Sequence, residues 1–407
     1  MGRGRSDGST LALPWPSWER GRHRPSVDAW VLTVTVLLAL FGLVMVYSAS
    51  AIVAGSRFHD WTYFLKRQVA WLAFGLCLLH LASRVDYMVW QRLAVPILVV
   101  TLILLILVLV PALGVTAKGA RRWLRLGPVS VQPAEVAKLV VVFYLASYLT
   151  RKEDRLRDLT SGFLPPLVVV GLIAALVLVQ PDLGTVVVMG LVTLGLLFLG
   201  GARPAHLVGI VLVSLPLGAA LILGSGYRRQ RLMTFLEPWK DPETAGFQVT
   251  QSFLAFGSGG PFGVGLGESR QKLFFLPEAH TDFVLALVGE ELGLVGTMTI
   301  LVLFAIFVLR GFQIASRAQH PFGRYLALGI TLLFGIQALI NAGVVTGLLP
   351  TKGLTLPLVS YGGSSLMVSL LGIGILLSIS RDRQGGRFGS GGLGARRGGR
   401  MRGYGTR

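Results

Sequence analysis

Residues 163–199 read FLPPLVVVGLIAALVLVQPDLGTVVVMGLVTLGLLFL. The only charged residue in this stretch is Asp182, which belongs to the triplet Gln180-Pro181-Asp182. A bilayer core of about 30 Å requires about 20 mostly apolar residues per helix, with a range near 17 to 25. The stretch therefore predicts two membrane-spanning helices that are joined by a tight turn at one membrane face.

The same apolar pattern recurs along the 407-residue chain. Hydrophobic residues make up 53% of the chain and charged residues only 14%, whereas roughly 25% of residues are charged in soluble domains. This composition excludes a soluble globular enzyme, a disordered chain and a repeat solenoid. We therefore expect an all-α polytopic membrane protein with about ten transmembrane helices. The segments that approach the length of a span are 30–46, 68–82, 93–115, 134–149, 163–179, 183–199, 205–223, 283–309, 325–345 and 365–380.

The placement of Lys and Arg predicts the orientation, because cytoplasmic loops carry an excess of positive charge. Most of the 38 lysines and arginines lie on the inner side if both termini are cytoplasmic. The expected organisation is a basic cytoplasmic N-terminal arm (1–26), a ten-helix membrane domain (27–383) and a disordered cytoplasmic tail rich in Gly and Arg (384–407). A large extracytoplasmic loop (224–282) joins the seventh and eighth helices.

Two features of the terminal regions have alternative interpretations. The small residues 48–51 after the first span imitate a signal-peptide cleavage site, but the apolar run is long for a signal peptide and favours a retained helix. The net charge of +19 and the Gly/Arg tail are compatible with RNA binding. Beside a membrane such a tail more often contacts anionic lipid, so we expect membrane lipid and no nucleic acid as a partner.

The predicted outer loops contain basic residues, although Lys and Arg are usually concentrated in the cytoplasmic loops. The third-to-fourth loop contains Lys118, Arg121 and Arg122, the large loop contains Lys272, and the ninth-to-tenth loop contains Lys352. Arginine forks and lysine point charges suit a phosphate or pyrophosphate. For any single residue, pairing with a loop acid or a lipid headgroup is the favoured alternative; for three separate loops that explanation is weaker.

Acidic residues accompany these basic residues. Asp282 lies where the chain enters the eighth predicted helix, and it is equally well interpreted as a helix cap or as a catalytic group. Glu278 and His280 precede it and are candidate substrate-binding residues, although an isolated histidine is more often structural. Glu290 and Glu291 lie two turns further on, where we expect them to pair with Arg or Lys from another span.

Three further charged residues are predicted inside or at the ends of spans. Glu135, Lys138 and Asp182 are interpreted mainly as polar groups that hold helices together. The alternative is that they line a transport path.

The sequence contains no recognisable metal or nucleotide motif. The one cysteine, Cys77, and six scattered histidines have no metal-ligand spacing. Glycine runs at 257–260, 263–267 and 362–363 allow close backbone approach to a ligand, but they are not a phosphate-binding loop. No cofactor is predicted with certainty, and a divalent cation is compatible with phosphate chemistry.

The chain resembles the SEDS family (shape, elongation, division and sporulation), and within it the FtsW type rather than the RodA type. The greater similarity to the FtsW type rests on residues 277–283 (PEAHTDF) and 349–357 (LPTKGLTLP). The other matching blocks are 118–123, 132–138 (QPAEVAK), 180–185 (QPDLGT), 251–260, 271–282, 289–296 and 347–365.

The resemblance implies a peptidoglycan glycosyltransferase in the bacterial cytoplasmic membrane at the division septum. Its substrate would be lipid II, an undecaprenyl-pyrophosphate disaccharide-pentapeptide, and its product a β-1,4-linked glycan strand. It also implies a class B penicillin-binding protein as transpeptidase partner, together with other divisome membrane proteins. The family's essential aspartate maps onto Asp282. The remaining alternatives are a lipid II flippase and a non-catalytic scaffold.

Overall fold

The computed structural model describes residues 27–117, 120–127, 129–242, 246–272 and 279–385. Within these ranges nine helices are long and apolar enough to cross a membrane, and a shorter apolar helix, α6, occupies a further predicted span. The architecture is therefore the expected all-α polytopic membrane protein. The long helices are α1 (Ala29–Phe58), α2 (Tyr63–Arg84), α3 (Met88–Leu109), α4 (Pro133–Lys152), α5 (Leu164–Val179, which reaches the length of a span together with the helical turn that begins at Leu159), α7 (Pro204–Leu223), α11 (Gly293–Ser316), α12 (Pro321–Val345) and α13 (Gly363–Gly385).

The turn predicted at residues 180–182 is present. Helix α5 ends at Val179 and α6 (Leu183–Leu199) begins directly after Asp182. Asp182 caps α6, because its carboxylate accepts a hydrogen bond from the backbone N–H of Thr185 at 3.1 Å. A 3-10 turn, η2 (Glu153–Arg155), and a π-helical turn, η3 (Leu159–Phe163), connect α4 to α5.

Three predicted spans differ from the structure. The first was predicted to end at Val46, but α1 continues to Phe58 and includes the small residues 48–51. The span predicted to reach Val115 ends at Leu109, because the chain turns at Gly114 into a small antiparallel sheet of order β1-β2-β3. The span predicted to run unbroken from Phe283 is divided into α10 (Val284–Glu291) and α11, with the break at Leu292. The strands are β1 (Gly114–Ala117), β2 (Ala120–Leu126) and β3 (Val129–Val131).

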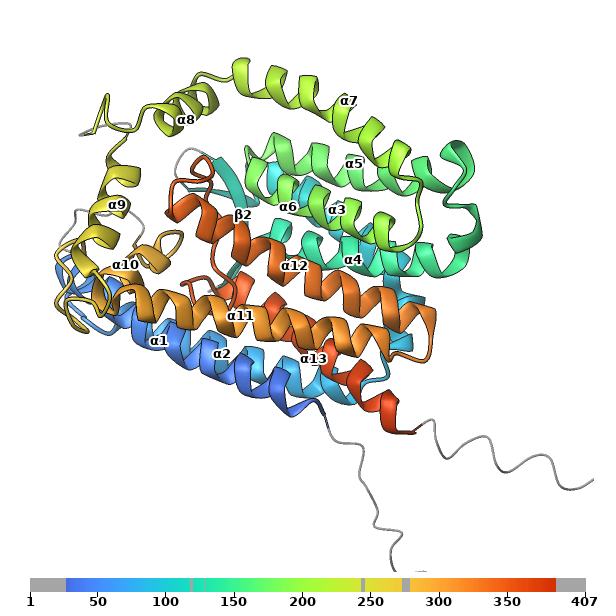
Figure 1. The fold of residues 1–407 in the computed structure, drawn as a ribbon, viewed down its shortest axis with the longest axis horizontal. Helices are drawn as coiled ribbons and strands as arrows, with labels where there is room; N and C mark the ends of the chain where they lie inside the picture. Colours follow the sequence, from blue (N-terminus) through green and yellow to red (C-terminus); the bar gives the residue numbers. More distant parts are fainter. Residues whose placement is uncertain (1–26, 118–119, 128, 243–245, 273–278, 386–407) are drawn as a thin grey trace, which may run out of the picture.

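The segment predicted as a large loop also contains helices. They are α8 (Gly226–Leu236) and α9 (Phe247–Gly259). In Figure 1, α8, α9 and α10 lie at the left-hand end of the bundle, whereas α1 begins and α13 ends at the lower right. The backbone N–H of Asp28 donates to Ser380 Oγ at 3.2 Å, so the start of α1 and the end of α13 share one end. The arm before residue 27 and the tail after residue 385 lie outside the described residues.

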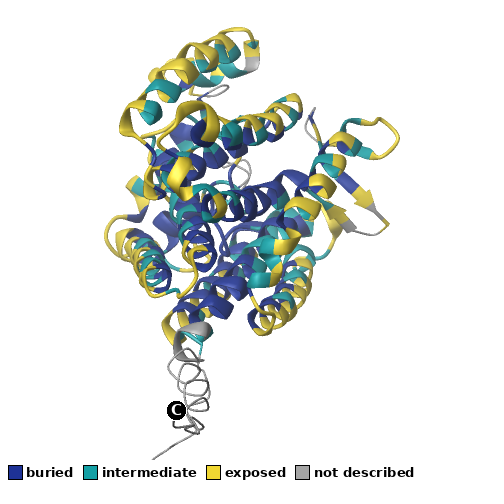
Figure 2. Cartoon of the chain, turned by 90° about the vertical axis from the view of Figure 1, so that its right-hand side faces the viewer, coloured by how far each residue is buried: buried dark blue, intermediate teal, exposed yellow. Residues whose placement is uncertain are grey.

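The centre of the bundle is formed by α4, α12 and α13, which are the most buried of the long helices. Figure 2 shows buried residues in the middle and exposed residues on the outside. Lipid tails are as apolar as leucine, so close packing rather than hydrophobicity holds such helices together. Helix α2 packs closely along α13: a side chain at Gly374 would overlap the backbone of Leu79.

Candidate functional site

Asp282 lies where the start of α10 meets α12 and the loop that follows α12. The side-chain amide of Asn341 in α12 donates to the carbonyl oxygen of Asp282 at 3.0 Å and to that of Leu354 at 2.7 Å. A Cβ atom at Gly353 would lie 3.1 Å from Asp282 Oδ2, so the carboxylate faces the backbone of the loop between α12 and α13. Phe283, not Asp282, occupies the N-cap position of α10.

Lys352 belongs to the same loop, next to Gly353. It is half-buried, and burial lowers the pKa of its ammonium group below the ordinary value. Arg231 in α8 donates to the carbonyl oxygen of Thr351 at 3.0 Å. The structure thus brings the carboxylate of the predicted catalytic Asp282 to the loop that carries the predicted substrate-binding Lys352.

His280 is packed into an aromatic cluster beside this junction. Its ring centroid lies 5.0 Å from that of Phe64 and 5.7 Å from that of Tyr361. Its carbonyl oxygen accepts a hydrogen bond from the N–H of Tyr361 at 2.9 Å. Burial raises the pKa of Tyr361, even though the nearby guanidinium of Arg67 acts in the opposite direction.

Sequence reasoning missed Phe64, Arg67, Tyr361 and Asn341 as neighbours of the candidate site. Phe64 and Arg67 lie in the first turns of α2, and Tyr361 lies near the end of the loop between α12 and α13. The signal for Asn341 was available, because an amide side chain inside an apolar span requires a polar partner. Nothing local indicated that the start of α2 would reach the same place.

The basic residues of β2 have different environments. Arg121 is exposed, and its Nε lies 3.4 Å from Thr116 Oγ1. Arg122 donates from Nε to Gln180 O at 2.9 Å and from Nη2 to Pro181 O at 2.7 Å. Arg122 thereby ties the sheet to the turn between α5 and α6. Lys118, predicted in the same cluster, lies outside the described residues, as does Glu278.

Glu290, Glu291 and Lys272 meet at the break between α10 and α11. Lys272 Nζ lies 3.5 Å from Glu291 Oε1, which also accepts a hydrogen bond from Ser48 Oγ of α1 at 2.6 Å. Glu290 accepts hydrogen bonds from Ser269 Oγ and from the backbone N–H of Arg270. The lysine that pairs with Glu291 therefore comes from the preceding loop rather than from another span.

A second buried ion pair lies deeper in the bundle. Lys138 Nζ is 2.9 Å from Glu135 Oε2 and donates to Gln337 Oε1 at 2.9 Å. The amide of Gln337 in turn donates to Thr355 O at 2.8 Å. These contacts connect α4 and α12 to the loop that carries Lys352. Among the described residues, no group of three His, Cys, Asp or Glu side chains could hold a metal ion.

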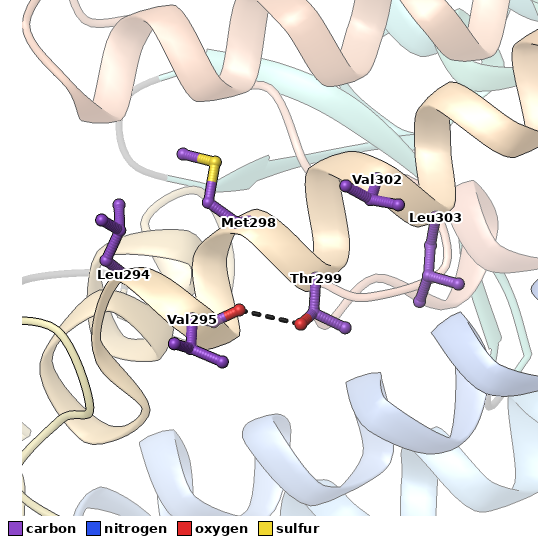
Figure 3. A pocket seen from close by; sticks show the side chains of 6 residues that line it. All are labelled: Leu294, Val295, Met298, Thr299, Val302 and Leu303. Carbon is purple, nitrogen blue, oxygen red and sulfur yellow. Dashed lines mark hydrogen bonds between the residues drawn. The ribbon is translucent and has the colours of Figure 1, made fainter.

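Two apolar grooves lie on the bundle. One, of about 420 Å³, is lined by Ala70, Trp71 and Phe74 of α2 together with Val131 of β3 and Met367 of α13. The other, of about 440 Å³, follows one face of α11 (Figure 3). Its lining residues are Leu294, Val295, Met298, Thr299, Val302 and Leu303.

Known proteins resemble the chain along most of its length. It is 50% identical over 358 residues to a protein of Geobacter metallireducens named "Probable peptidoglycan glycosyltransferase FtsW", covering 88% of this chain and 96% of the relative. It is 42% identical to "Stage V sporulation protein E" of Bacillus subtilis, covering 88% and 98%.

Two solved structures of peptidoglycan-synthesis and cell-shape proteins are also similar to the chain. A chain from the study "Structural coordination of polymerization and crosslinking by a peptidoglycan synthase complex" matches with a TM-score of 0.73 and 33% identity, covering 88% of this chain and 99% of that one. The rod shape determining protein RodA of Thermus thermophilus matches with a TM-score of 0.65 and 30% identity, covering 88% and 98%.

The family model for FtsW, RodA and SpoVE, described as "Cell cycle protein", matches residues 28–385. This range includes every helix and strand described above. The chain therefore belongs to the FtsW/RodA/SpoVE family, the SEDS family.

Proposed function

We propose that the protein is a peptidoglycan glycosyltransferase that polymerises lipid II into β-1,4 glycan strands during bacterial cell division. The observation that carries the proposal is the placement of Asp282. Its carboxylate lies against the backbone at Gly353, next to Lys352 in the sequence, at the end of the bundle where α8, α9 and α10 lie. This contact with the loop that carries Lys352 supports a site in which an acid and a cation act together, as transfer of a sugar from a pyrophosphate requires.

The proposed reaction is a single displacement. The Asp282 carboxylate removes the proton from the 4-hydroxyl of the acceptor sugar, whose oxygen forms a bond to C1 of the donor. The bond between C1 and the pyrophosphate oxygen breaks, and the pyrophosphate leaves with the electron pair. One displacement converts an α-linked donor into a β-linked product, so a covalent enzyme intermediate is not needed.

Basic side chains would neutralise the departing pyrophosphate. The position of Lys352 beside Gly353, which the Asp282 carboxylate approaches, supports this role for Lys352, and exposure supports it for Arg121. Lys118, Arg122 and Lys272 remain predicted contacts from the sequence, as do Glu278 and His280 for the rest of the substrate. A divalent cation accompanying the pyrophosphate would supply the same neutralisation, and polymerisation in the presence of a chelator tests its contribution.

The remaining parts of the proposal concern the lipid tail, the partner and the location. The groove beside α2, β3 and α13 would hold the prenyl chain, since its lining is apolar and it adjoins the sheet that carries Arg121.

A class B penicillin-binding protein would be the transpeptidase partner, with its membrane helix on the groove of α11 (Figure 3). We place both termini in the cytoplasm and the protein at the division septum.

One experiment tests the central claim. The purified chain, with and without the class B partner, is given fluorescent lipid II in detergent, where a flippase has no measurable activity. We expect polymer with the parental chain and a rate about 10² to 10⁴ lower for Asp282→Asn. A folded Asp282→Asn variant that polymerises at the parental rate would refute the role of Asp282. Absence of polymer under both conditions would favour the flippase or the scaffold.

A further inference from the structure

Helix α12 holds the loop between α12 and α13 with two amide side chains that lie one turn apart. Asn341 donates to the carbonyl oxygen of Leu354 at 2.7 Å, and Gln337 donates to that of Thr355 at 2.8 Å. Residues four apart lie on the same face of a helix, so both amides reach the loop from one face of α12. Both side chains are buried, and an unpaired carbonyl group is costly in such surroundings.

The loop has a conformation that depends on its surroundings. Leu358 has a φ of +67°, in the left-handed region, which a residue with a side chain adopts only when neighbouring contacts enforce it. The backbone also lies close against α1, because a Cβ atom at Gly42 would overlap the carbonyl oxygen of Leu358. Leu356 and Val359 are buried as well. The loop is therefore packed into the bundle, and the position of its exposed start at Gly353 depends on how the following residues are held.

Lys138 sets the orientation of the Gln337 amide. Lys138 Nζ lies 2.9 Å from Gln337 Oε1 and 2.9 Å from Glu135 Oε2. An ammonium group only donates hydrogen bonds, so the oxygen of the amide has to face Lys138 and its NH2 group is directed to the loop. A backbone carbonyl group only accepts, so the NH2 group is the end that Thr355 requires. The buried ion pair of α4 thus aligns a donor with the loop.

The contacts continue from Thr355 to Asp282 without a gap. Leu354 precedes Thr355, and the amide of Asn341 binds both the carbonyl oxygen of Leu354 and that of Asp282. Gly353 precedes Leu354, and a Cβ atom at Gly353 would lie 3.1 Å from Asp282 Oδ2. A shift of Thr355 therefore moves the backbone that faces the proposed base.

We propose that Gln337 is a positioning residue that, with its amide oriented by Lys138, holds the loop between α12 and α13 against Asp282. The inference rests on the proposed polymerase function. Lys138 and Glu135 then do more than hold helices together, because they fix the direction of a hydrogen bond that reaches the site. A misplacement of a reacting group by about 1 Å can reduce a rate by about 10², so loss of this donor lowers kcat.

Exchanging two side chains separates this role from a purely structural one. Gln337→Glu replaces the donor toward Thr355 by an acceptor, and it leaves two buried carboxylates with one lysine, which should lower the unfolding temperature. The double variant Glu135→Gln/Gln337→Glu again has one carboxylate beside Lys138 and should recover most of that loss. We expect kcat to fall at least about tenfold in both variants, with KM for lipid II within about twofold of the parent.

Two further variants complete the kinetic test. Gln337→Met keeps a side chain of similar length without a donor and without an added charge, and its kcat should fall as in the double variant. Gln313→Glu is the matched control: Gln313 is exposed on α11, and its Oε1 accepts a hydrogen bond from Arg310 at 2.9 Å, which a carboxylate retains. This control should leave kcat unchanged. A parental kcat in Gln337→Met, or in the double variant once its stability has returned, would overturn the proposal.

Hydrogen exchange measures the loop independently of activity. Several backbone N–H groups of residues 351–361 are hydrogen-bonded, among them those of Leu354, Leu356 and Tyr361, so mass spectrometry of this segment reports its opening. Exchange should be at least about tenfold faster in Gln337→Met and in the double variant than in the parent and the control. Parental exchange in both variants would also overturn the proposal. Absence of polymer from the parental chain would instead count against the proposed function, while the exchange rates would still show whether Gln337 holds the loop.

Discussion

The side-chain amide of Asn341 donates a hydrogen bond to the backbone carbonyl oxygen of Asp282 at 3.0 Å. The same amide donates to Leu354 O at 2.7 Å. One buried side chain of α12 therefore holds the segment that carries the proposed base and the loop that carries the proposed cation. The relative position of these two groups depends on α12.

Replacing Asn341 by Ala should destabilise the protein and reduce polymerisation. The substitution leaves two carbonyl groups without their donor, and an unsatisfied buried group costs about 1–3 kcal/mol. Thermal unfolding in detergent measures the loss of stability, and the lipid II assay measures the rate. Thr346→Ala, which removes only a hydroxyl bonded within the same helix end, should change stability by less than about 0.5 kcal/mol. Equal behaviour of the two variants would contradict the role given to Asn341.

A methyl group at Gly353 should reduce activity with little effect on folding. In Gly353→Ala the new Cβ would lie 3.1 Å from Asp282 Oδ2, so the carboxylate has to move. We expect kcat to fall at least about tenfold, because small displacements of a reacting group are costly. Gly362→Ala is the matched control, since its nearest contacts would lie at 3.7 Å. A parental kcat for Gly353→Ala would show that this contact does not influence the reaction.

Arg121 and Arg122 should give different results although they are adjacent. Arg121→Ala should raise KM for lipid II without lowering the unfolding temperature, because the side chain is exposed and available to an anion. Arg122→Ala should lower the unfolding temperature, because two charge-assisted hydrogen bonds to the α5–α6 turn are lost, each about 1.5–3 kcal/mol. Titration calorimetry with pyrophosphate, together with thermal unfolding, separates the two effects. The assignment fails if Arg121→Ala destabilises the fold as much as Arg122→Ala.

Lys352 should determine the alkaline limit of activity. Burial lowers the pKa of its ammonium group, so the positive charge is present below that pKa and is lost as the pH rises through it, earlier than for an exposed lysine. We expect kcat/KM to decline at alkaline pH and Lys352→Arg, whose charge persists, to move the decline upward. The pH profile of both proteins checks this, and identical alkaline limbs would exclude Lys352 as the responsible group.

Sequence reasoning was most successful where composition alone decides the structure. Apolar stretches and the Gln180-Pro181-Asp182 turn located the spans, because satisfying the backbone in lipid requires helices. It was wrong at Gly114, where a strand replaces the expected end of a span, and at Leu292, where an apolar pattern continues through a helix break. The strand at Gly114 depends on pairing with β2, which follows it directly, and the helix break depends on residues 260–265, which are distant in the chain.

The candidate site was likewise predictable from the sequence only in part. Asp282 and Lys352 were identified from their positions near predicted span ends and from the resemblance. The contacts that relate them pass through Asn341 and Gly353, and neither spacing nor charge could indicate them. The internal partners of Arg122 and Lys272 were equally inaccessible, since they depend on which backbone segments meet.

Helix α7, at the top of the bundle in Figure 1, has 20 residues, all of them described and none of them buried. At a rise of 1.5 Å per residue it is about 30 Å long, which equals the thickness of the hydrocarbon core. Few protein contacts therefore restrain this helix, and its tilt can adjust to the thickness of the hydrocarbon core. Helix α8 follows at Gly226 and contacts Thr351 through Arg231, so α7 is the membrane helix that connects the surrounding lipid to the loop that carries Lys352.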